Sequence, residues 1–226
     1  MPIKGILFDF DGTLANTTDL ILAAFDHTFT RFLKRRVPRE EIIETFGLPL
    51  ADAMAMYAPS PDMITDMRAV YRQFNLEHHD EMIKSISGVA DALTALHADG
   101  IKMAVVTSKK SPMANRGLKC CGLEAFISAV VGCDDTENNK PHPEPMLKAC
   151  KMLDLLPQEC ICVGDSPYDL QSGKRAGALT AAVRYTSFEW QVMLQEGKPD
   201  FVLDNMLDFL PIIDKLNFSE EVRRNA

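Results

Sequence analysis

Long hydrophobic runs are absent from this sequence of 226 residues. No stretch approaches the ~20 consecutive apolar residues that a transmembrane helix needs. The amino terminus reads MPIKGILFDFD and runs directly into acidic residues, without the pattern of a cleavable signal peptide. The sequence therefore predicts a cytoplasmic protein that has no membrane partner.

An excess of positive charge is also lacking. Lysine and arginine number 24 against 32 aspartates and glutamates, which gives a net charge of −8. Nucleic acids and anionic lipid surfaces attract basic proteins, so we expect neither as a partner. A small anionic substrate is compatible with this balance, because a few local cations or a bound metal decide its binding.

The six cysteines lack the spacing of known cysteine motifs. No CxxC pair occurs, and no group of Cys and His has the spacing of a zinc site. Cys120 and Cys121 are adjacent, and Cys160 and Cys162 alternate within a predicted strand. We interpret the cysteines as buried free thiols that act as small apolar residues.

The stretch from Gly5 to Leu14 reads GILFDFDGTL and combines an apolar run with Asp9 and Asp11. A short continuous apolar run that ends in a turn is typical of a strand buried on both faces of a parallel sheet. Proteins of the α/β class place their ligands at the carboxyl ends of such strands. Two carboxylates at this position need a cation or a proton between them. The stretch therefore predicts a metal-assisted acid site.

The rest of the chain divides into two patterns. Residues 16–85 are helical in pattern, whereas helices and strands alternate from residue 86 onward, and no convincing strand appears between Leu14 and Ser85. Repeated βα units predict an α/β fold, here a Rossmann-like doubly wound parallel sheet. We expect a catalytic core at 1–15 and 86–226 and an inserted α-helical cap at 16–85. The later strands are predicted at Lys102–Thr107, Ala129–Val131, Cys160–Gly164, Leu179–Val183 and Phe201–Leu203.

Polar clusters follow four of the predicted strands. They are Asp9–Thr13, Thr107–Lys109, Lys140–Pro141 and Gly164–Asp169. Adjacent strands in a sheet lie about 5 Å apart, so these distant segments can share one pocket. Within the second cluster, Lys109 is expected to point to solvent and to take no part in function.

Together the clusters supply several carboxylates, a hydroxyl and an ammonium group, a set that suits phosphoryl transfer. The carboxylates can hold a divalent cation of the magnesium type, which takes oxygen ligands. This cation and Lys140 can neutralise the charge that spreads over the phosphoryl oxygens. One carboxylate can attack phosphorus, and its neighbour can protonate the leaving oxygen and then activate water.

The motifs DFDGT, a strand-final Thr, a later Lys-Pro and GDSPYD, in this order, resemble the four motifs of the haloacid dehalogenase superfamily of phosphatases. The match covers essentially the whole chain. Within the superfamily the pattern is similar to phosphoglycolate phosphatases and bacterial inorganic pyrophosphatases. The stretches YRQFNLEHHDEM and DDTENNKPHPEP look nearest to the pyrophosphatases.

The resemblance implies a hydrolase that forms an aspartyl-phosphate intermediate and uses Mg²⁺ as its cofactor. Its activity would be that of a phosphoric monoester hydrolase or an inorganic pyrophosphatase. Its partner would be a small phosphorylated substrate, such as a phosphoglycolate-like metabolite, or pyrophosphate. A monomer or a dimer is expected.

The resemblance also implies a role for each motif residue. Asp9 would be the nucleophile and a metal ligand, and Asp11 would be the general acid and base, with its carbonyl on the metal. Thr107 would hold the phosphoryl group, Lys140 would balance its charge, and Asp165 would bind the metal directly. The remaining implied positions are Asp169 at the metal or beside the lysine, and Gly12, Thr13 and Ser108 at the phosphoryl group.

Substrate discrimination is expected from the cap, where the sequence says less. Gly47 lies where similar caps carry a specificity loop. Arg72, Asn75 and His79 follow a spacing of i, i+3 and i+7, so one helix face could present them to an anion. Arg68 shares the face of Arg72 as a weaker candidate. An ordinary polar helix face explains these residues equally well.

Three other functions are compatible with parts of the pattern. A sugar phosphomutase would use the same core but return the phosphoryl group to a sugar. A dehalogenase needs the nucleophile but no acid two residues later, so Asp11 argues against it. A non-catalytic regulatory or scaffold protein could keep the fold, but every catalytic position is filled here.

Overall fold

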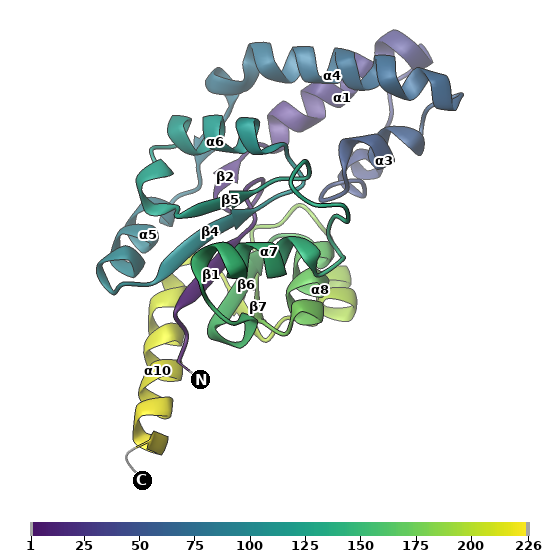
Figure 1. Cartoon of the computed structure of the whole chain (residues 1–226). Coiled ribbons are helices and arrows are strands. Elements are labelled where there is room, and N and C mark those ends of the chain that lie inside the picture. The colour runs from purple at the N-terminus through teal and green to yellow at the C-terminus, as the bar shows by residue number, and fades with distance from the viewer. Residues whose placement is uncertain (1, 225–226) are drawn as a thin grey trace.

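A six-stranded sheet forms the centre of the computed structural model, which describes residues 2–224 (Figure 1). The strand order is β5-β4-β1-β6-β7-β8, and every pairing is parallel. The strands are β1 (Gly5–Phe8), β4 (Lys102–Val106), β5 (Ala129–Val131), β6 (Cys160–Gly164), β7 (Leu179–Val183) and β8 (Phe201–Leu203).

Strand β1 lies in the middle of this sheet. All four of its residues are buried, and it pairs with β4 on one side and β6 on the other. The chain adds β4 and β5 outward in one direction and then returns to add β6, β7 and β8 in the other. The strand order thus reverses at β1, and such a switch point leaves a crevice at the carboxyl ends of the strands. The doubly wound α/β fold is confirmed.

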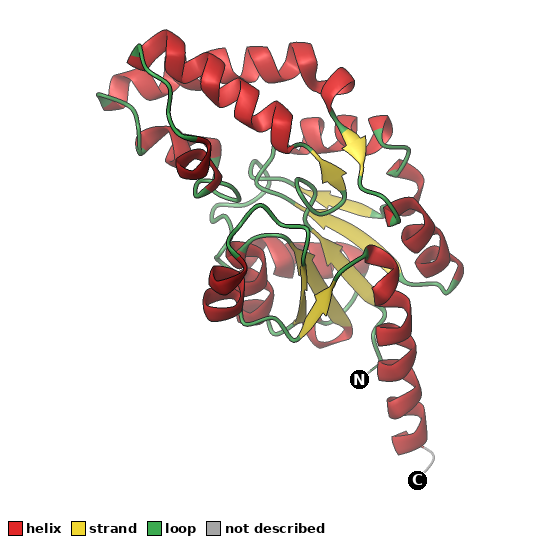
Figure 2. Cartoon of the chain, turned by 180° about the vertical axis from the view of Figure 1, so that it is seen from behind, coloured by secondary structure: helices red, strands yellow, loops and turns green. Residues whose placement is uncertain are grey.

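Helices cover both faces of the sheet (Figure 2). Successive strand residues point to opposite faces, so Ile6 and Phe8 enter one hydrophobic cluster and Leu7 enters the other. The flanking helices are α5 (Val89–Ala98), α6 (Ser111–Cys120), α7 (Glu144–Leu153), α8 (Pro167–Ala176), α9 (Trp190–Val192) and α10 (Phe209–Arg224). Short helical turns lie at Glu124–Phe126, Pro157–Glu159, Met193–Gly197 and Met206–Asp208.

Four further helices are inserted after β1 and have a core of their own. In this core the ring centroid of Phe25 lies 5.3 Å from that of Phe29 and 5.0 Å from that of Tyr71. The contact between Phe25 and Tyr71 connects the first of these helices to the last. The inserted helices are α1 (Thr18–Leu33), α2 (Arg39–Ile43), α3 (Leu50–Ala55) and α4 (Pro61–Met82). They lie beyond the carboxyl ends of the strands and share a cavity with them (Figure 1).

A two-stranded sheet stands where the chain enters and leaves the inserted helices. Strand β2 (Ala15–Asn16) pairs antiparallel with β3 (Lys84–Ser85). The expectation of no strand between residues 14 and 85 is therefore wrong. Each strand has only two residues and is held by its partner across the insertion, so no local periodicity could reveal it.

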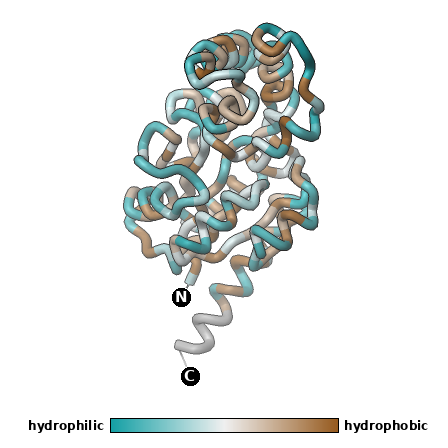
Figure 3. The backbone as a smooth tube through the Cα atoms, turned by 90° about the vertical axis from the view of Figure 1, so that its right-hand side faces the viewer, coloured by the Kyte–Doolittle hydropathy of each residue, from teal (hydrophilic) through white to brown (hydrophobic). Residues whose placement is uncertain are grey.

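The described helices mix hydrophobic and hydrophilic residues along their length (Figure 3). None of the helices within residues 2–224 is long and apolar enough to cross a membrane.

Candidate active site

The loop after β1 holds Asp9 and Asp11 at the carboxyl end of the strand. The backbone N–H of Asp9 donates to the Val163 carbonyl at 2.8 Å, which fixes it beside β6. The next residues turn tightly, and Gly12 has a φ of 79°. A Cβ atom at Gly12 would lie 2.2 Å from Oδ2 of Asp165. Glycine at this position therefore allows the β1 loop and the end of β6 to approach closely.

Lys140 connects two of the buried carboxylates. Its Nζ atom donates to Asp9 Oδ1 at 2.8 Å and to the Val106 carbonyl at 3.1 Å, and it also contacts Asp169 Oδ1. The other oxygen of Asp169 accepts a hydrogen bond of 2.6 Å from Ser166 Oγ at the start of α8. Asp169 therefore orients Lys140 with one oxygen and, with the other, completes the capping box of α8, whose N-cap residue is Ser166.

Negative charge exceeds positive charge at this site. Burial raises the pKa of Asp9 to about 7, although the ammonium of Lys140 acts in the opposite direction. Burial, together with the charges of Asp9 and Asp169, raises the pKa of Asp165 well above its usual value. Burial opposes the charged form of Lys140, but Asp169 and Asp9 outweigh it and raise its pKa. A further cation would relieve this imbalance.

The donor atoms present fit a divalent cation. Oxygen atoms of Asp9, Asp165 and Asp169 lie within 4.8 Å of one another. No hydrogen bond to the Asp165 carboxylate occurs in the described part of the chain, although Asp165 is only 6% exposed. Carboxylate oxygens are the ligands that hard divalent cations prefer. Asp9 and Asp165 could therefore bind the ion directly, with Asp169 behind them.

A cavity of about 630 Å³ opens over these carboxylates. The sheet side contributes Asp9, Asp11, Gly12, Thr107, Ser108 and Asp165. The inserted helices and loops contribute Gly47, Arg68, Arg72 and Asn75, along with apolar side chains. Lys140, Asp169, Thr13 and His79 lie outside this lining.

The end of β4 adds a hydroxyl group and a contact with the insertion. The N–H of Thr107 donates to the Val131 carbonyl at 2.9 Å, and Thr107 is only 5% exposed. Ser108 Oγ donates to the Gly47 carbonyl at 2.6 Å, which brings the loop before α3 to the end of β4. Gly47 has a φ of 81°, and a Cβ there would lie 3.0 Å from Ser166 Oγ.

The expectation that the Lys109 side chain points to solvent is wrong. The side chain is 13% exposed, and Nζ lies 2.6 Å from Oδ1 of Asp11. Nζ also lies 5.2 Å from the centroid of the Phe10 ring. The two partners are 98 residues apart in sequence, so no spacing rule could predict their contact.

Thr13 is fully buried below the loop. Its carbonyl accepts a hydrogen bond of 3.1 Å from Tyr185 Oη. Its own hydroxyl has no partner among the described residues. Thr13 therefore holds the loop in place, whereas Gly12 faces the cavity.

His79 is separated from the other residues of its predicted helix face. Arg72 and Asn75 line the cavity with Arg68, but His79 is fully buried, and its Nδ1 lies 2.7 Å from Oδ1 of Asp80. His79 is on the same helix face, but seven residues place it about 10 Å further along α4, where α6 packs against the last turn. Arg68 is the residue that completes the row, and its Nε has no hydrogen-bond partner among the described residues.

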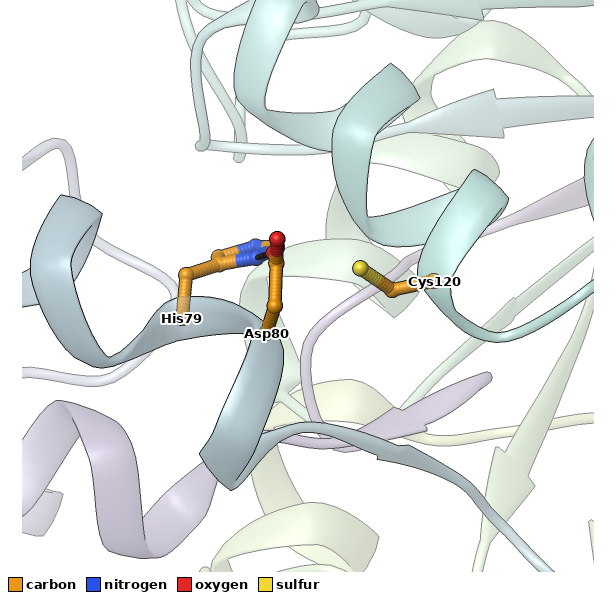
Figure 4. Close-up of side chains that lie close together, drawn as sticks. All are labelled: His79, Asp80 and Cys120. Atoms are coloured by element: carbon orange, nitrogen blue, oxygen red, sulfur yellow. Dashed lines mark hydrogen bonds and ion pairs between the residues drawn. The ribbon is translucent and has the colours of Figure 1, made fainter.

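Asp80 connects α4 to α6. Nε of Arg116 lies 2.9 Å from Asp80 Oδ1, and Nη2 lies 2.9 Å from Oδ2. Figure 4 shows His79 and Asp80 on α4 opposite Cys120 at the end of α6, and their donor atoms lie within 4.8 Å of one another. Because Arg116 already neutralises Asp80, we interpret this cluster as a contact between the two helices.

The fold and the site together define a doubly wound α/β enzyme whose acidic site lies at the switch point of its sheet. Residues 6–183 match a family model described as haloacid dehalogenase-like hydrolase. The match spans most of the chain, so the protein belongs to the haloacid dehalogenase-like hydrolase family, as the sequence motifs predict.

Two relatives with similar sequences are named as pyrophosphatases. Pyrophosphatase PpaX of Bacillus mycoides (strain KBAB4) is 40% identical over 217 residues, which are 96% of this chain and 100% of the relative. A protein of Clostridium perfringens (strain 13 / Type A), also named for pyrophosphatase PpaX, is 44% identical over 215 residues, which are 95% of this chain and 99% of the relative.

Solved structures share the fold. The crystal structure of CbbY from Rhodobacter sphaeroides in complex with phosphate has a TM-score of 0.78 and 26% identity, and covers 91% of this chain and 96% of that chain. A haloacid dehalogenase-like hydrolase from Bacteroides fragilis has a TM-score of 0.85 at 22% identity, over 92% of this chain and 99% of that chain, and shows the fold alone.

Proposed function

We propose that this protein hydrolyses phosphoryl groups through an aspartyl-phosphate intermediate, with a divalent cation of the magnesium type. The observation that carries the proposal is the arrangement under the cavity, in which Lys140 joins Asp9 to Asp169 while Asp11 stands on the same loop. The match of residues 6–183 to the haloacid dehalogenase-like hydrolases supports it.

In the proposed reaction, an oxygen of Asp9 attacks phosphorus, and the bond from phosphorus to the leaving oxygen breaks. Asp11 gives a proton to that oxygen and then takes one from a water molecule, which attacks phosphorus and releases phosphate and the free Asp9 carboxylate. Lys140 keeps one Asp9 oxygen oriented throughout. Thr107 and the neighbouring loop amides hold the phosphoryl oxygens.

Asp9 and Asp165 would hold the cation, and the carbonyl of Asp11 would be a further ligand. When bound, it supplies positive charge that offsets the charge of the attacked phosphoryl group. The positions of these ligands determine where the positive charge of the cation lies. Asp169 takes part through Lys140 because its two oxygens already have partners.

We also propose that residues 16–85 act as a cap over a core of residues 1–15 and 86–226. The cap lines one side of the cavity and touches the core through Ser108 and Gly47. Closing it would exclude water other than the one that hydrolyses the intermediate. Gly47, Arg68, Arg72 and Asn75 are the cap residues assigned to the substrate.

Inorganic pyrophosphate is the first substrate to test, because the relatives at 40% and 44% identity are named pyrophosphatases. A phosphoglycolate-like phosphate monoester is the second, since the chemistry at phosphorus is the same for both.

The test compares Asp9→Asn with Asp99→Asn, which makes the same change at the exposed end of α5. Phosphate release from pyrophosphate, 2-phosphoglycolate and p-nitrophenyl phosphate is measured with and without Mg²⁺. We expect Asp9→Asn to be inactive but folded by circular dichroism, and Asp99→Asn to keep the activity of the unmodified protein. Activity in Asp9→Asn equal to that of Asp99→Asn would contradict the mechanism.

A further inference from the structure

Lys109 stands at the wall of the cavity in a fixed position. Its N–H donates to Thr107 Oγ1 at 3.2 Å, and its carbonyl accepts from the N–H of Cys133 at 3.0 Å. The backbone is therefore held on both sides, at the end of β4 and at the end of β5. Its side chain then reaches across the ring of Phe10 to Asp11.

Within the described chain, Lys109 is the one side chain that forms a hydrogen bond or ion pair with the carboxylate of Asp11. Lys140, the other ammonium close to the phosphoryl site, is engaged by Asp9 and Asp169. Lys140 therefore holds the proposed nucleophile Asp9, and Lys109 holds Asp11, the second aspartate of the loop.

This contact has a consequence for the proposed reaction. While the carboxylate of Asp11 is paired with an ammonium at 2.6 Å, it faces Lys109 and not an incoming leaving group. The side chains of Asp11 and Lys109 are 22% and 13% exposed and both line the cavity, so an anion in the cavity can reach the pair. A second anion that enters the cavity competes with Asp11 for the same ammonium.

We propose that Lys109 determines specificity for substrates whose leaving group carries its own negative charge. An anionic leaving group takes the ammonium of Lys109, and this exchange frees the Asp11 carboxylate, which takes up a proton from solvent and faces the leaving oxygen to which it gives that proton. A phosphate or a carboxylate beside the leaving oxygen satisfies this requirement, whereas an uncharged alcohol or phenol does not. The inference rests on the proposed function and deepens it, because it names the class of leaving group.

The test uses Lys109→Met, which keeps most of the apolar stem and removes the charge, and Lys109→Arg, which keeps the charge. Lys119→Met is the matched control, since it makes the same change of net charge at an exposed position near the end of α6. Thermal unfolding of each variant checks that it is folded. Turnover of pyrophosphate is compared with turnover of p-nitrophenyl phosphate, whose leaving group has no second anion.

We expect Lys109→Met to lower kcat/KM for pyrophosphate by about 10- to 100-fold more than for p-nitrophenyl phosphate, the range for losing one hydrogen bond to a charged group. Lys109→Arg should keep part of the kcat/KM for pyrophosphate that Lys109→Met loses. Lys119→Met should change kcat/KM little, and by the same factor for both substrates. Equal losses on both substrates in Lys109→Met would overturn the proposal, because a merely structural role affects every substrate alike.

A binding measurement separates this inference from the proposed function. Calorimetry measures the affinity of the unmodified protein and of Lys109→Met for imidodiphosphate, which is not hydrolysed, and for inorganic phosphate. The inference expects a selective loss for imidodiphosphate, and equal affinities in the two proteins would overturn it. If the unmodified protein hydrolyses no phosphate compound, the proposed function fails, while the binding result still decides the role of Lys109.

Discussion

Replacing Gly12 by alanine should damage the site through one contact, and the chain contains a matched control for it. Gly12 and Gly100 have similar positive φ angles of 79° and 74°. A Cβ at Gly12 would lie 2.2 Å from Oδ2 of Asp165, whereas a Cβ at Gly100 meets nothing within 4 Å. The difference between the two variants therefore isolates the collision with Asp165.

The left-handed conformation costs an alanine roughly 1–2 kcal/mol, so Gly100→Ala should lower the free energy of unfolding by that amount. Gly12→Ala should add about 1–3 kcal/mol for the forced displacement of a packed group. Because the displaced group is the proposed metal ligand, the Mg²⁺ concentration for half-maximal activity should rise about 10- to 100-fold.

Urea unfolding without metal gives the two stability changes, and phosphate release as a function of Mg²⁺ concentration gives the metal requirement. Gly100→Ala should keep the metal requirement of the unmodified protein. The reasoning is refuted if Gly12→Ala and Gly100→Ala lose the same stability and keep the same metal requirement.

Three further predictions concern charged groups. Lys140→Met should lower the free energy of unfolding without metal by about 3–5 kcal/mol, because it leaves buried carboxylates unpaired; a loss below that of an exposed lysine would contradict this. Arg116→Ala should cost at most about 1 kcal/mol in urea unfolding, since its ion pair with Asp80 is exposed, and a larger loss would show that the contact between α4 and α6 is stronger than a surface pair. Burial lowers the pKa of His79 below 6.5, so below that pH the unfolded chain binds a proton that the folded protein does not. The contribution of His79 to stability should therefore fall from pH 7 to pH 5, by at most about 1.4 kcal/mol for each unit of pKa shift. Burial raises the pKa of Asp9 and Asp165, which acts in the opposite direction, so this contribution is measured as the difference between the unmodified protein and His79→Gln, in which the nearby Asp80, Lys109, Arg116 and Cys120 are unchanged. A difference that does not vary with pH would contradict the assignment.

The strands of the sheet could be predicted because their signal is local. Cys160–Gly164, Leu179–Val183 and Phe201–Leu203 have the predicted bounds, since a strand buried on both faces is an uninterrupted apolar run. The pair β2 and β3 escaped prediction because two-residue strands carry no periodicity. Their pairing depends on a contact between segments that the insertion separates.

In the site, too, the residues that could be predicted are those with a local sequence signal. Asp9, Asp11, Thr107 and Asp165 could be placed at strand ends from the sequence, and they line one cavity. His79 followed the helical spacing of Arg72 and Asn75 but lies outside the cavity, because α6 packs against the last turn of α4 and Asp80 holds it there.

The sequence by itself determined the fold and which acidic residues stand at the ends of its central strands, because buried strands and the motifs that follow them consist of consecutive residues. Only the tertiary structure decided which lysine serves which aspartate. Lys140 lies 131 positions from Asp9, and Lys109 lies 98 positions from Asp11. A sequence does not show which charged side chains are paired, because the partners meet only when the sheet brings their strand ends within hydrogen-bonding distance.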